Sequence, residues 1–227
     1  MKPSLSFLLL LLGAVLARAD VVIVQTIDGM AQSGTMTMTV GADKIRTDIG
    51  PGMSSIVDTA SGDTTTIMQA QQSYMVMPAA TMKAMAAQGM AMAAQQTGTT
   101  SSNPATPLAT GKRDKINGYD ASEYTYSNGN IKATYWICEN YPNGQMIKDA
   151  LTKFQKSSFA SMIKGMTPDL TTLPGIPIKT EVLVNGQKLT TTLVSATEQT
   201  VDPSVYQVPA GYNEIKMPAM PGALGPQ

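Results

Sequence analysis

The sequence predicts an α+β protein in which a strongly curved antiparallel sheet, a half-barrel, carries helices packed on its concave face. Three observations predict this fold. Apolar and polar residues alternate with a period of two over 21–77, helical spacing covers 79–96 and 144–166, and two Asn-Gly pairs interrupt alternating segments. Two helices are too few to cover both faces of a parallel sheet, so we expect antiparallel strands.

The first part of the chain is predicted to form six successive strands. In the second of them Met36, Met38 and Val40 alternate with threonines, so the apolar side chains share one face. Glycine-rich turns separate the strands. The predicted strands are 21–29, 34–40, 43–49, 54–59, 64–69 and 73–77.

A helix and a linker are predicted next. Ala, Met and Gln dominate residues 79–96, and Met82, Met85 and Met92 fall on one helical face. Residues 97–111 are rich in Thr, Ser, Pro and Gly, which is typical of a flexible linker or a long surface loop.

Two hairpins follow from the Asn-Gly pairs, which favour type I′ turns. A two-residue turn at Asn128-Gly129 would pair Tyr126 with Ile131 and Tyr124 with Ala133. A turn at Asn185-Gly186 would likewise define a second hairpin, and its predicted pairs are Val184–Gln187, Val182–Leu189, Thr180–Thr191 and Ile178–Leu193. A last short strand is expected at 203–208, and a disordered tail from 217 to 227.

The helix predicted over 144–166 has an apolar stripe of Ile147, Leu151 and Phe154. Within a half-barrel this stripe should meet the methionine helix and the first Asn-Gly hairpin. We therefore predict that one set of side chains lines a ligand-binding concavity: Met82, Met85, Met92, Tyr124, Ile147, Leu151 and Phe154.

Residues 1–19 are typical of a cleavable secretory signal. Lys2 precedes a short apolar stretch, and Ala17-Arg18-Ala19 is a small-residue cleavage site before Asp20. The stretch is too short for a transmembrane segment, and no Cys lies near the site to be acylated. We expect one domain over 20–216, soluble in the periplasm or secreted.

Composition narrows the chemistry. The chain has 16 basic and 16 acidic side chains, and loss of Lys2 and Arg18 with the signal leaves a net charge of −2, which argues against nucleic-acid binding. There is no His, which excludes His-based metal sites and catalysis. The single Cys138 forms no internal disulfide, and we expect it to be buried, the alternative being an intermolecular bridge.

No catalytic residue, metal site or cofactor is predicted. Nucleophile-elbow, phosphate-loop and dinucleotide motifs are absent. Carboxylates at Asp114, Asp120, Glu123 and Glu139 could form a catalytic pair, but nothing in the sequence places two of them together. We therefore expect a protein that is not an enzyme.

Two alternatives concern binding chemistry. The methionine pairs 36/38, 75/77, 82/85 and 90/92 have the spacing of thioether Cu(I) sites, although core packing explains the same pattern. The charged cluster of Asp43, Lys44, Arg46 and Asp48 is explained by a solvated edge or face, and the alternative is that Arg46 holds an anionic head group at the barrel mouth.

Three segments of the chain form an ordered set of motifs. The first is Lys44-Ile45-Arg46-Thr47-Asp48 with Ile56-Val57-Asp58 and Tyr74-Met75-Val76-Met77-Pro78. The second is Ile116-Asn117-Gly118-Tyr119-Asp120-Ala121-Ser122-Glu123-Tyr124 leading to Trp136. The third is Gly175-Ile176-Pro177-Ile178-Lys179 followed by Val205-Tyr206-Gln207-Val208-Pro209-Ala210-Gly211-Tyr212. In this order the three segments resemble the DUF4412 family of exported bacterial proteins.

The family in turn resembles lipoprotein carriers and receptors of the LolA/LolB type, which implies an incomplete barrel with a hydrophobic concavity capped by helices. The chain departs from that type in its inserted Met/Ala helix and in lacking an acylated Cys. The resemblance implies no catalytic residues. The expected function is binding of a hydrophobic or amphipathic ligand, a lipid or an acylated protein. The alternative is a structural or partner-binding envelope protein with a self-filled core.

Overall fold

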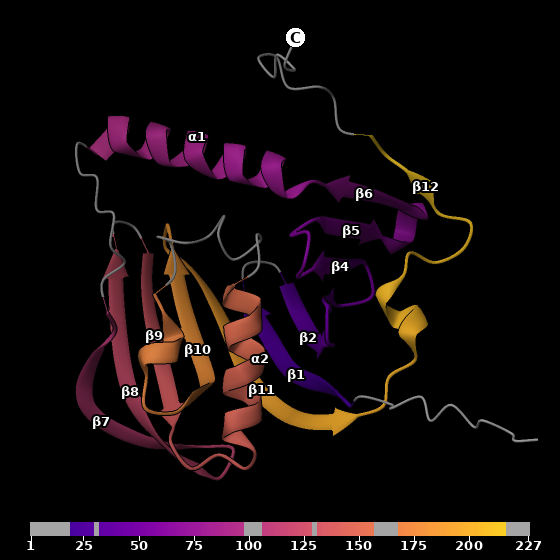
Figure 1. Ribbon diagram of the computed structural model, residues 1–227. Helices are drawn as coiled ribbons and strands as arrows, with labels where there is room; N and C mark the ends of the chain where they lie inside the picture. Colours follow the sequence, from indigo (N-terminus) through magenta and orange to yellow (C-terminus); the bar gives the residue numbers. More distant parts are fainter. Residues whose placement is uncertain (1–18, 30–31, 98–105, 129–130, 157–167, 217–227) are drawn as a thin grey trace, which may run out of the picture.

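The computed structural model describes residues 19–29, 32–97, 106–128, 131–156 and 168–216, and Figure 1 draws the other residues in grey. The predicted signal up to residue 18 and the predicted tail at 217–227 lie outside the described residues. So does the expected linker as far as residue 105.

The N-terminal part of the sheet is the meander that the alternating pattern predicts. Its strands are β1 (Asp20–Gly29), β2 (Gln32–Val40), β3 (Lys44–Ile49), β4 (Met53–Asp58), β5 (Thr64–Met68) and β6 (Ser73–Met77). Each strand pairs antiparallel with the next. The six predicted strands are confirmed, with ends that differ by no more than two residues.

A second meander completes the sheet. Its strands are β7 (Leu108–Ile116), β8 (Tyr119–Asn128), β9 (Ile131–Cys138), β10 (Ile176–Val184) and β11 (Gln187–Gln199). Because β11 pairs with β1, the two meanders form one antiparallel sheet. A short strand, β12 (Asn213–Glu214), adds to β6 in parallel. Over the described residues the order is β12-β6-β5-β4-β3-β2-β1-β11-β10-β9-β8-β7, and Figure 1 shows a large, curved sheet that does not close.

Two helices connect the strands. The first, α1 (Ala79–Thr97), leaves β6 beside one edge of the sheet, and the chain re-enters at β7 on the opposite edge. Figure 1 shows α1 crossing above the strand ends of the second meander. The second, α2 (Gly144–Gln155), lies against β1 and β10. The predicted helix 144–166 thus ends at Gln155, and residues 157–167 lie outside the description.

Strand β7 corrects the prediction for residues 97–111, because the strand already begins at Leu108. Asn117 and Gly118 have φ angles of 50° and 86° and connect β7 to β8. This is the left-handed geometry that Asn-Gly provides in a type I′ turn. A third Asn-Gly pair in the sequence was therefore a usable signal for this hairpin.

The two predicted hairpins have different outcomes. In the hairpin at Asn185-Gly186, the pairs Val184–Gln187, Val182–Leu189 and Thr180–Thr191 form as predicted. The predicted pair Ile178–Leu193 does not form. In the first, Tyr126 pairs with Ala133 instead of Ile131, so the predicted register is wrong by two residues. An even shift keeps each side chain on its face, and the predicted face composition therefore survives.

The predicted strand at 203–208 is wrong. Pro203–Tyr206 instead forms the 3-10 helix η3, because Asp202 caps Ser204 N at 2.8 Å and Pro203 supplies a fixed φ at the first position. Two further 3-10 turns, η1 (Gln69–Gln71) and η2 (Leu170–Thr172), lie in loops.

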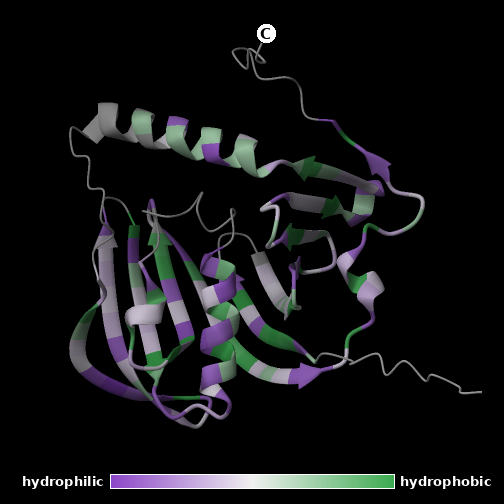
Figure 2. Ribbon diagram, viewed as in Figure 1, coloured by the Kyte–Doolittle hydropathy of each residue, from purple (hydrophilic) through white to green (hydrophobic). Residues whose placement is uncertain are grey.

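The main hydrophobic core lies between α2 and the sheet. Buried residues of both meanders, among them Ile23, Ile45 and Ile178, pack with Ile147 and Ala150 of α2. Figure 2 shows green bands alternating with purple and white ones along these strands, and α1 in pale green over most of its length. The expectation that helices pack on the sheet holds for α2. On α1, by contrast, Met82 is the buried residue among those whose burial is described.

Candidate functional site

The structure places the α2 residues of the predicted ligand site in the core. Ile147 is 3% exposed, and Leu151 and Phe154 are half-buried against the same apolar cluster. The stripe at spacings of three and four therefore does meet the sheet, as its pattern predicts. These three side chains stabilise the fold through burial, whatever else they do.

Tyr124 belongs to a different group, which we call the tyrosine cluster. It comprises the buried residues Tyr126, Ala133, Tyr135, Ile137 and Leu173 with Tyr124, Leu170 and Val182 packed against them. Tyr124 lies opposite Tyr135 across β8 and β9. Burial, and then the neighbouring Tyr126, raise the pKa of the Tyr135 phenol, so it remains a neutral donor at physiological pH.

The hydroxyl group of Tyr126 is buried without a hydrogen-bond partner. Its residue is 3% exposed, and its Oη has no hydrogen-bond partner in the structure. A buried hydroxyl without a partner costs about 1–3 kcal/mol. The tyrosine cluster thus offers a donor that a bound acceptor could satisfy.

The methionines of the predicted site lie on α1. Met82 is 1% exposed and Met85 is 39% exposed, while the Met92 side chain lies outside the described residues. Neither Met82 nor Met85 belongs to either apolar cluster. The structure therefore brings Ile147, Leu151 and Phe154 together and places the other described members of the predicted set elsewhere.

The other methionine pairs serve packing or lie on strands. Met38 is a core residue of β2, and Met75 and Met77 lie on β6. Within the described part of the chain, no group of three or more Cys, Asp or Glu side chains could hold a metal ion. Cys138 is buried, as expected, and burial raises the pKa of its thiol.

A small pocket of about 130 Å³ opens where α2 meets the start of β1. Sequence reasoning missed it, because its walls come from four separate elements and no motif joins them. Its lining residues are Ala19, Val21, Val40, Gly41, Ala42, Met146, Asp149, Ala150, Lys153 and Glu198.

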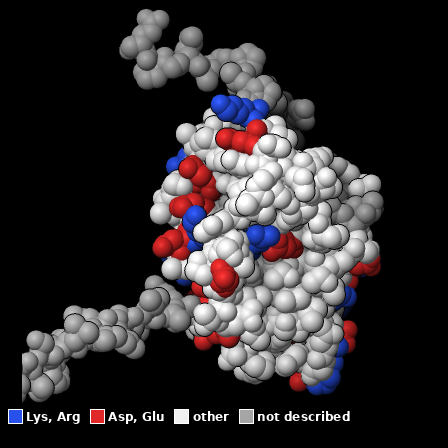
Figure 3. All heavy atoms as spheres, turned by 90° about the vertical axis from the view of Figure 1, so that its right-hand side faces the viewer, with Lys and Arg blue, Asp and Glu red and all other residues white. Residues whose placement is uncertain are grey.

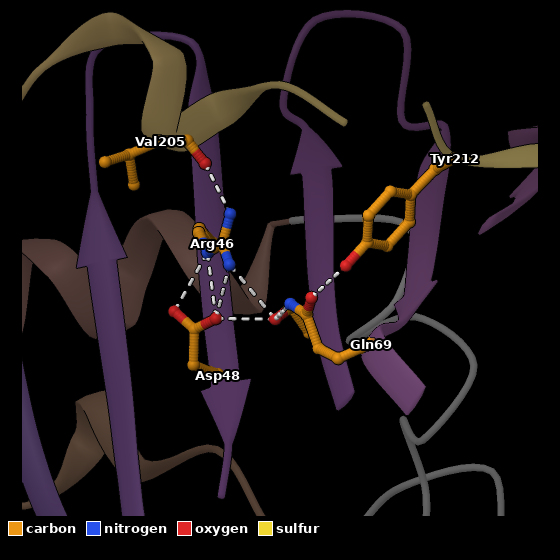
Figure 4. A network of polar contacts seen from close by, with 6 residues as sticks. Arg46, Asp48, Gln69, Val205 and Tyr212 are labelled. Carbon is orange, nitrogen blue, oxygen red and sulfur yellow. Dashed lines mark hydrogen bonds and ion pairs between the residues drawn. The ribbon is translucent and has the colours of Figure 1, made fainter. Parts of the chain in front are cut away.

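A polar network, the clasp, ties the C-terminal segment to the first meander (Figure 4). Arg46 Nη2 contacts Asp48 Oδ1 at 2.7 Å, and Arg46 Nη1 donates to the Val205 carbonyl at 2.7 Å. Ser54 Oγ donates to Asp48 Oδ1 at 2.6 Å. The Arg46 fork is thus occupied by the protein itself, which removes the basis for assigning it to an anionic head group.

The clasp continues to Tyr212, near the end of the described residues. Gln69 Nε2 donates to Ser54 Oγ at 3.2 Å, and Tyr212 Oη donates to Gln69 Oε1. Burial opposes ionisation of Asp48, but hydrogen bonds from Arg46 and Ser54 and the Arg46 charge outweigh it and lower the pKa of this carboxyl. The clasp is therefore charged and intact at neutral pH.

The comparisons with known proteins now bear on these segments. A family model described as "Domain of unknown function (DUF4412)" matches residues 21–212. The chain belongs to the DUF4412 family. The segments that carry the resemblance meet in the clasp, because Arg46 and Asp48 come from the first and Val205 and Tyr212 from the third. In this member of the family, those motif residues therefore hold the fold together.

Solved structures give distant likenesses. PNGF-II is 10% identical, with a TM-score of 0.40; the match covers 88% of this chain and 31% of that one, so the chain spans about a third of PNGF-II. A DUF1329 family protein from Desulfovibrio piger is 9% identical with a TM-score of 0.23, over 85% of this chain and 91% of that one. No curated protein matches the chain. Among the described helices, none is both long and apolar enough to cross a membrane.

Proposed function

We propose that this DUF4412 protein is an exported, non-enzymatic protein that binds a hydrophobic or amphipathic ligand, a lipid or an acylated protein, beneath α1. The observation that carries the proposal is α1 itself. This helix of 19 residues contains a single charged side chain, Lys83, and its described residues are mostly exposed. Stable surface helices normally pair a buried apolar stripe with a charged face, and the α1 residues whose burial is described show one buried side chain, Met82, and one charge, Lys83.

The composition of α1 suits a variable apolar partner. Met85 is 39% exposed, and flexible thioether side chains adapt to differently shaped ligands. The surrounding sequence is equally uncharged, since Lys83 is the one charged residue between Asp63 and Lys112. A helix of this length spans about 28 Å, which is comparable to an extended acyl chain with its head group.

The tyrosine cluster would provide the polar contact of such a ligand. Tyr126 Oη is buried and unpartnered in an apolar setting, and an ester or amide carbonyl would accept its hydrogen bond. Binding sites of this kind are mainly apolar with few polar groups that fix orientation.

We propose a fold type, a processing site and a location for the protein as well. We take the curved sheet as a half-barrel of the LolA/LolB type, formed by one domain over 20–216, processed after Ala19 and located in the periplasm or outside the cell. Acidic and basic side chains mix on the face seen in Figure 3, with wide uncharged areas between them. On this face the mixture supports a partner other than nucleic acid, since a nucleic-acid site needs a basic patch.

One observation favours the alternative, a structural or partner-binding envelope protein. The α2 side chains pack against the sheet, and a pocket that the described residues form beside α2 has a volume of only about 130 Å³. Sites for small molecules usually enclose about 300 Å³ or more. In the alternative, α1 would contact a protein partner instead of a lipid.

Binding of a fluorescent C16 fatty acid to the processed protein tests the proposal. Met85→Glu should weaken binding by about tenfold or more, because a charge on α1 opposes apolar contact. Met53→Glu, on β4 with a similar 42% exposure, is the matched control and should leave binding unchanged. Absence of saturable binding, or equal effects of both variants, would favour the structural alternative. Native mass spectrometry of the extracted protein would identify a co-purifying lipid.

A further inference from the structure

The start of β1 is held in place on three sides. Asp20 is 9% exposed and Asp20 Oδ2 accepts a hydrogen bond from Tyr206 Oη at 2.8 Å. The next residue, Val21, lies between Glu198 of β11 and Val40 of β2 in the sheet. Ala19 and Val21 both line the small pocket, so the backbone nitrogen of Asp20 between them has a defined position beside it.

The pocket beside this nitrogen is lined by two acidic side chains and one basic side chain. Asp149 and Lys153 face it from α2, and Glu198 faces it from β11. Lys153 Nζ donates to the Gly41 carbonyl at 3.2 Å, and Asp149 Oδ1 accepts from Gln145 Nε2 at 2.9 Å. In the described part of the chain, neither Asp149 nor Glu198 forms an ion pair with a basic side chain.

We propose that this pocket receives the α-ammonium group of Asp20, which is created when the signal is removed after Ala19. The inference rests on the export and processing in the proposed function. Hydrolysis of the Ala19–Asp20 amide consumes one water: its oxygen joins the Ala19 carbonyl carbon, which leaves as a carboxylate, and Asp20 keeps the amine. An α-amino group has a pKa of about 7.7–8.0 and is mostly protonated at neutral pH.

Removal of the signal would thus create a positive charge, the α-ammonium group of Asp20, that stabilises the fold. Before cleavage this position holds a neutral peptide group, and the two carboxylates that line the pocket, Asp149 and Glu198, face a single base, Lys153. After cleavage Ala19 leaves the pocket wall that it shares with Asp149 and Glu198, and the new ammonium of Asp20 lies at that wall. Its position is fixed by sheet pairing, so little side-chain entropy opposes the contact, unlike in an ordinary surface ion pair.

The test compares two chains that both contain every described strand and helix. One begins at Asp20, released from a fusion by a protease that leaves no extra residue. The matched chain keeps residues 17–19 with Arg18→Gln, which moves the ammonium about 10 Å along an extended chain. We expect the Asp20 chain to melt about 2–4 °C higher. It should also react more slowly at its α-amine with an acylating reagent at pH 7.

The double variant Asp149→Asn with Glu198→Gln, made in both chains, tests whether these two carboxylates cause the difference in melting temperature. It should abolish the difference in melting temperature, because the ammonium then has no carboxylate partner in the pocket. Equal melting of the two parent chains, or a difference that the double variant leaves unchanged, would overturn the inference. N-terminal sequencing of the exported protein tests the processing step separately, since a start other than Asp20 would contradict that step alone.

Discussion

The guanidinium of Arg46 on β3 donates a 2.7 Å hydrogen bond to the backbone carbonyl of Val205, which lies 159 residues further along the chain. The same side chain holds Asp48 on its own strand. One arginine therefore joins the first meander to the segment that follows the last long strand. This contact makes the clasp a clear target for mutagenesis.

Replacing Arg46 by Lys should lower the free energy of unfolding by about 2 kcal/mol, because an ammonium does not reproduce the planar fork that reaches Asp48 and Val205 together. Urea denaturation would measure the change. Arg113→Lys, on the exposed strand β7, is the matched control and should change stability by less than about 0.5 kcal/mol. Equal effects at the two positions would show that the clasp adds little.

The clasp should also make the free energy of unfolding depend on pH in the acidic range. The pKa of Asp48 is lowered in the folded state, so its contribution is present above the ordinary value of 3.8 and is lost as pH falls through the folded value. Between pH 5 and pH 2 the wild-type protein should therefore lose more stability than Asp48→Asn, which has no such carboxylate. Parallel pH profiles for the two proteins would contradict this assignment.

Gly41 lies under the ring of Tyr206, and a methyl group at Gly41 would stand 2.8 Å from Tyr206 Oη and 3.0 Å from Cζ. Gly41→Ala should therefore displace η3, weaken the Tyr206–Asp20 hydrogen bond and lower stability by about 1–3 kcal/mol. Gly52→Ala, where the added methyl group meets open space, should be close to neutral in the same thermal unfolding assay.

Replacing a large apolar side chain by Ala should have different effects on the stability of the protein in the two helices. Ile147→Ala on α2 removes a side chain that is 3% exposed and should lower stability by about 3 kcal/mol. Met85→Ala on α1 should change stability by less than about 0.5 kcal/mol. Any loss of fatty-acid binding by Met85→Ala would then reflect lost contact and not unfolding. Strong destabilisation by Met85→Ala would show instead that α1 packs as part of the core.

Much of the local structure could be predicted because it depends on neighbours in sequence. Alternation alone located β1 to β6, and the Asn185-Gly186 turn determined the β10–β11 register, since a two-residue I′ turn leaves one pairing. The spacing of Ile147, Leu151 and Phe154 likewise identified the buried side of α2. In the first hairpin, the shift of two residues is visible at Asn128, which pairs with Ile131 where the prediction placed it in the turn.

By itself, the sequence determined strands β1 to β6, the start of both helices and the β10–β11 turn, because those follow from the period of side chains and from residues that accept a positive φ. Only the tertiary structure decided which distant segments meet. The pairing of β1 with β11, the clasp of Arg46 with Val205, and the pocket at Asp20 each join residues more than a hundred positions apart. Such contacts depend on the curvature of the whole sheet, and no local pattern records it.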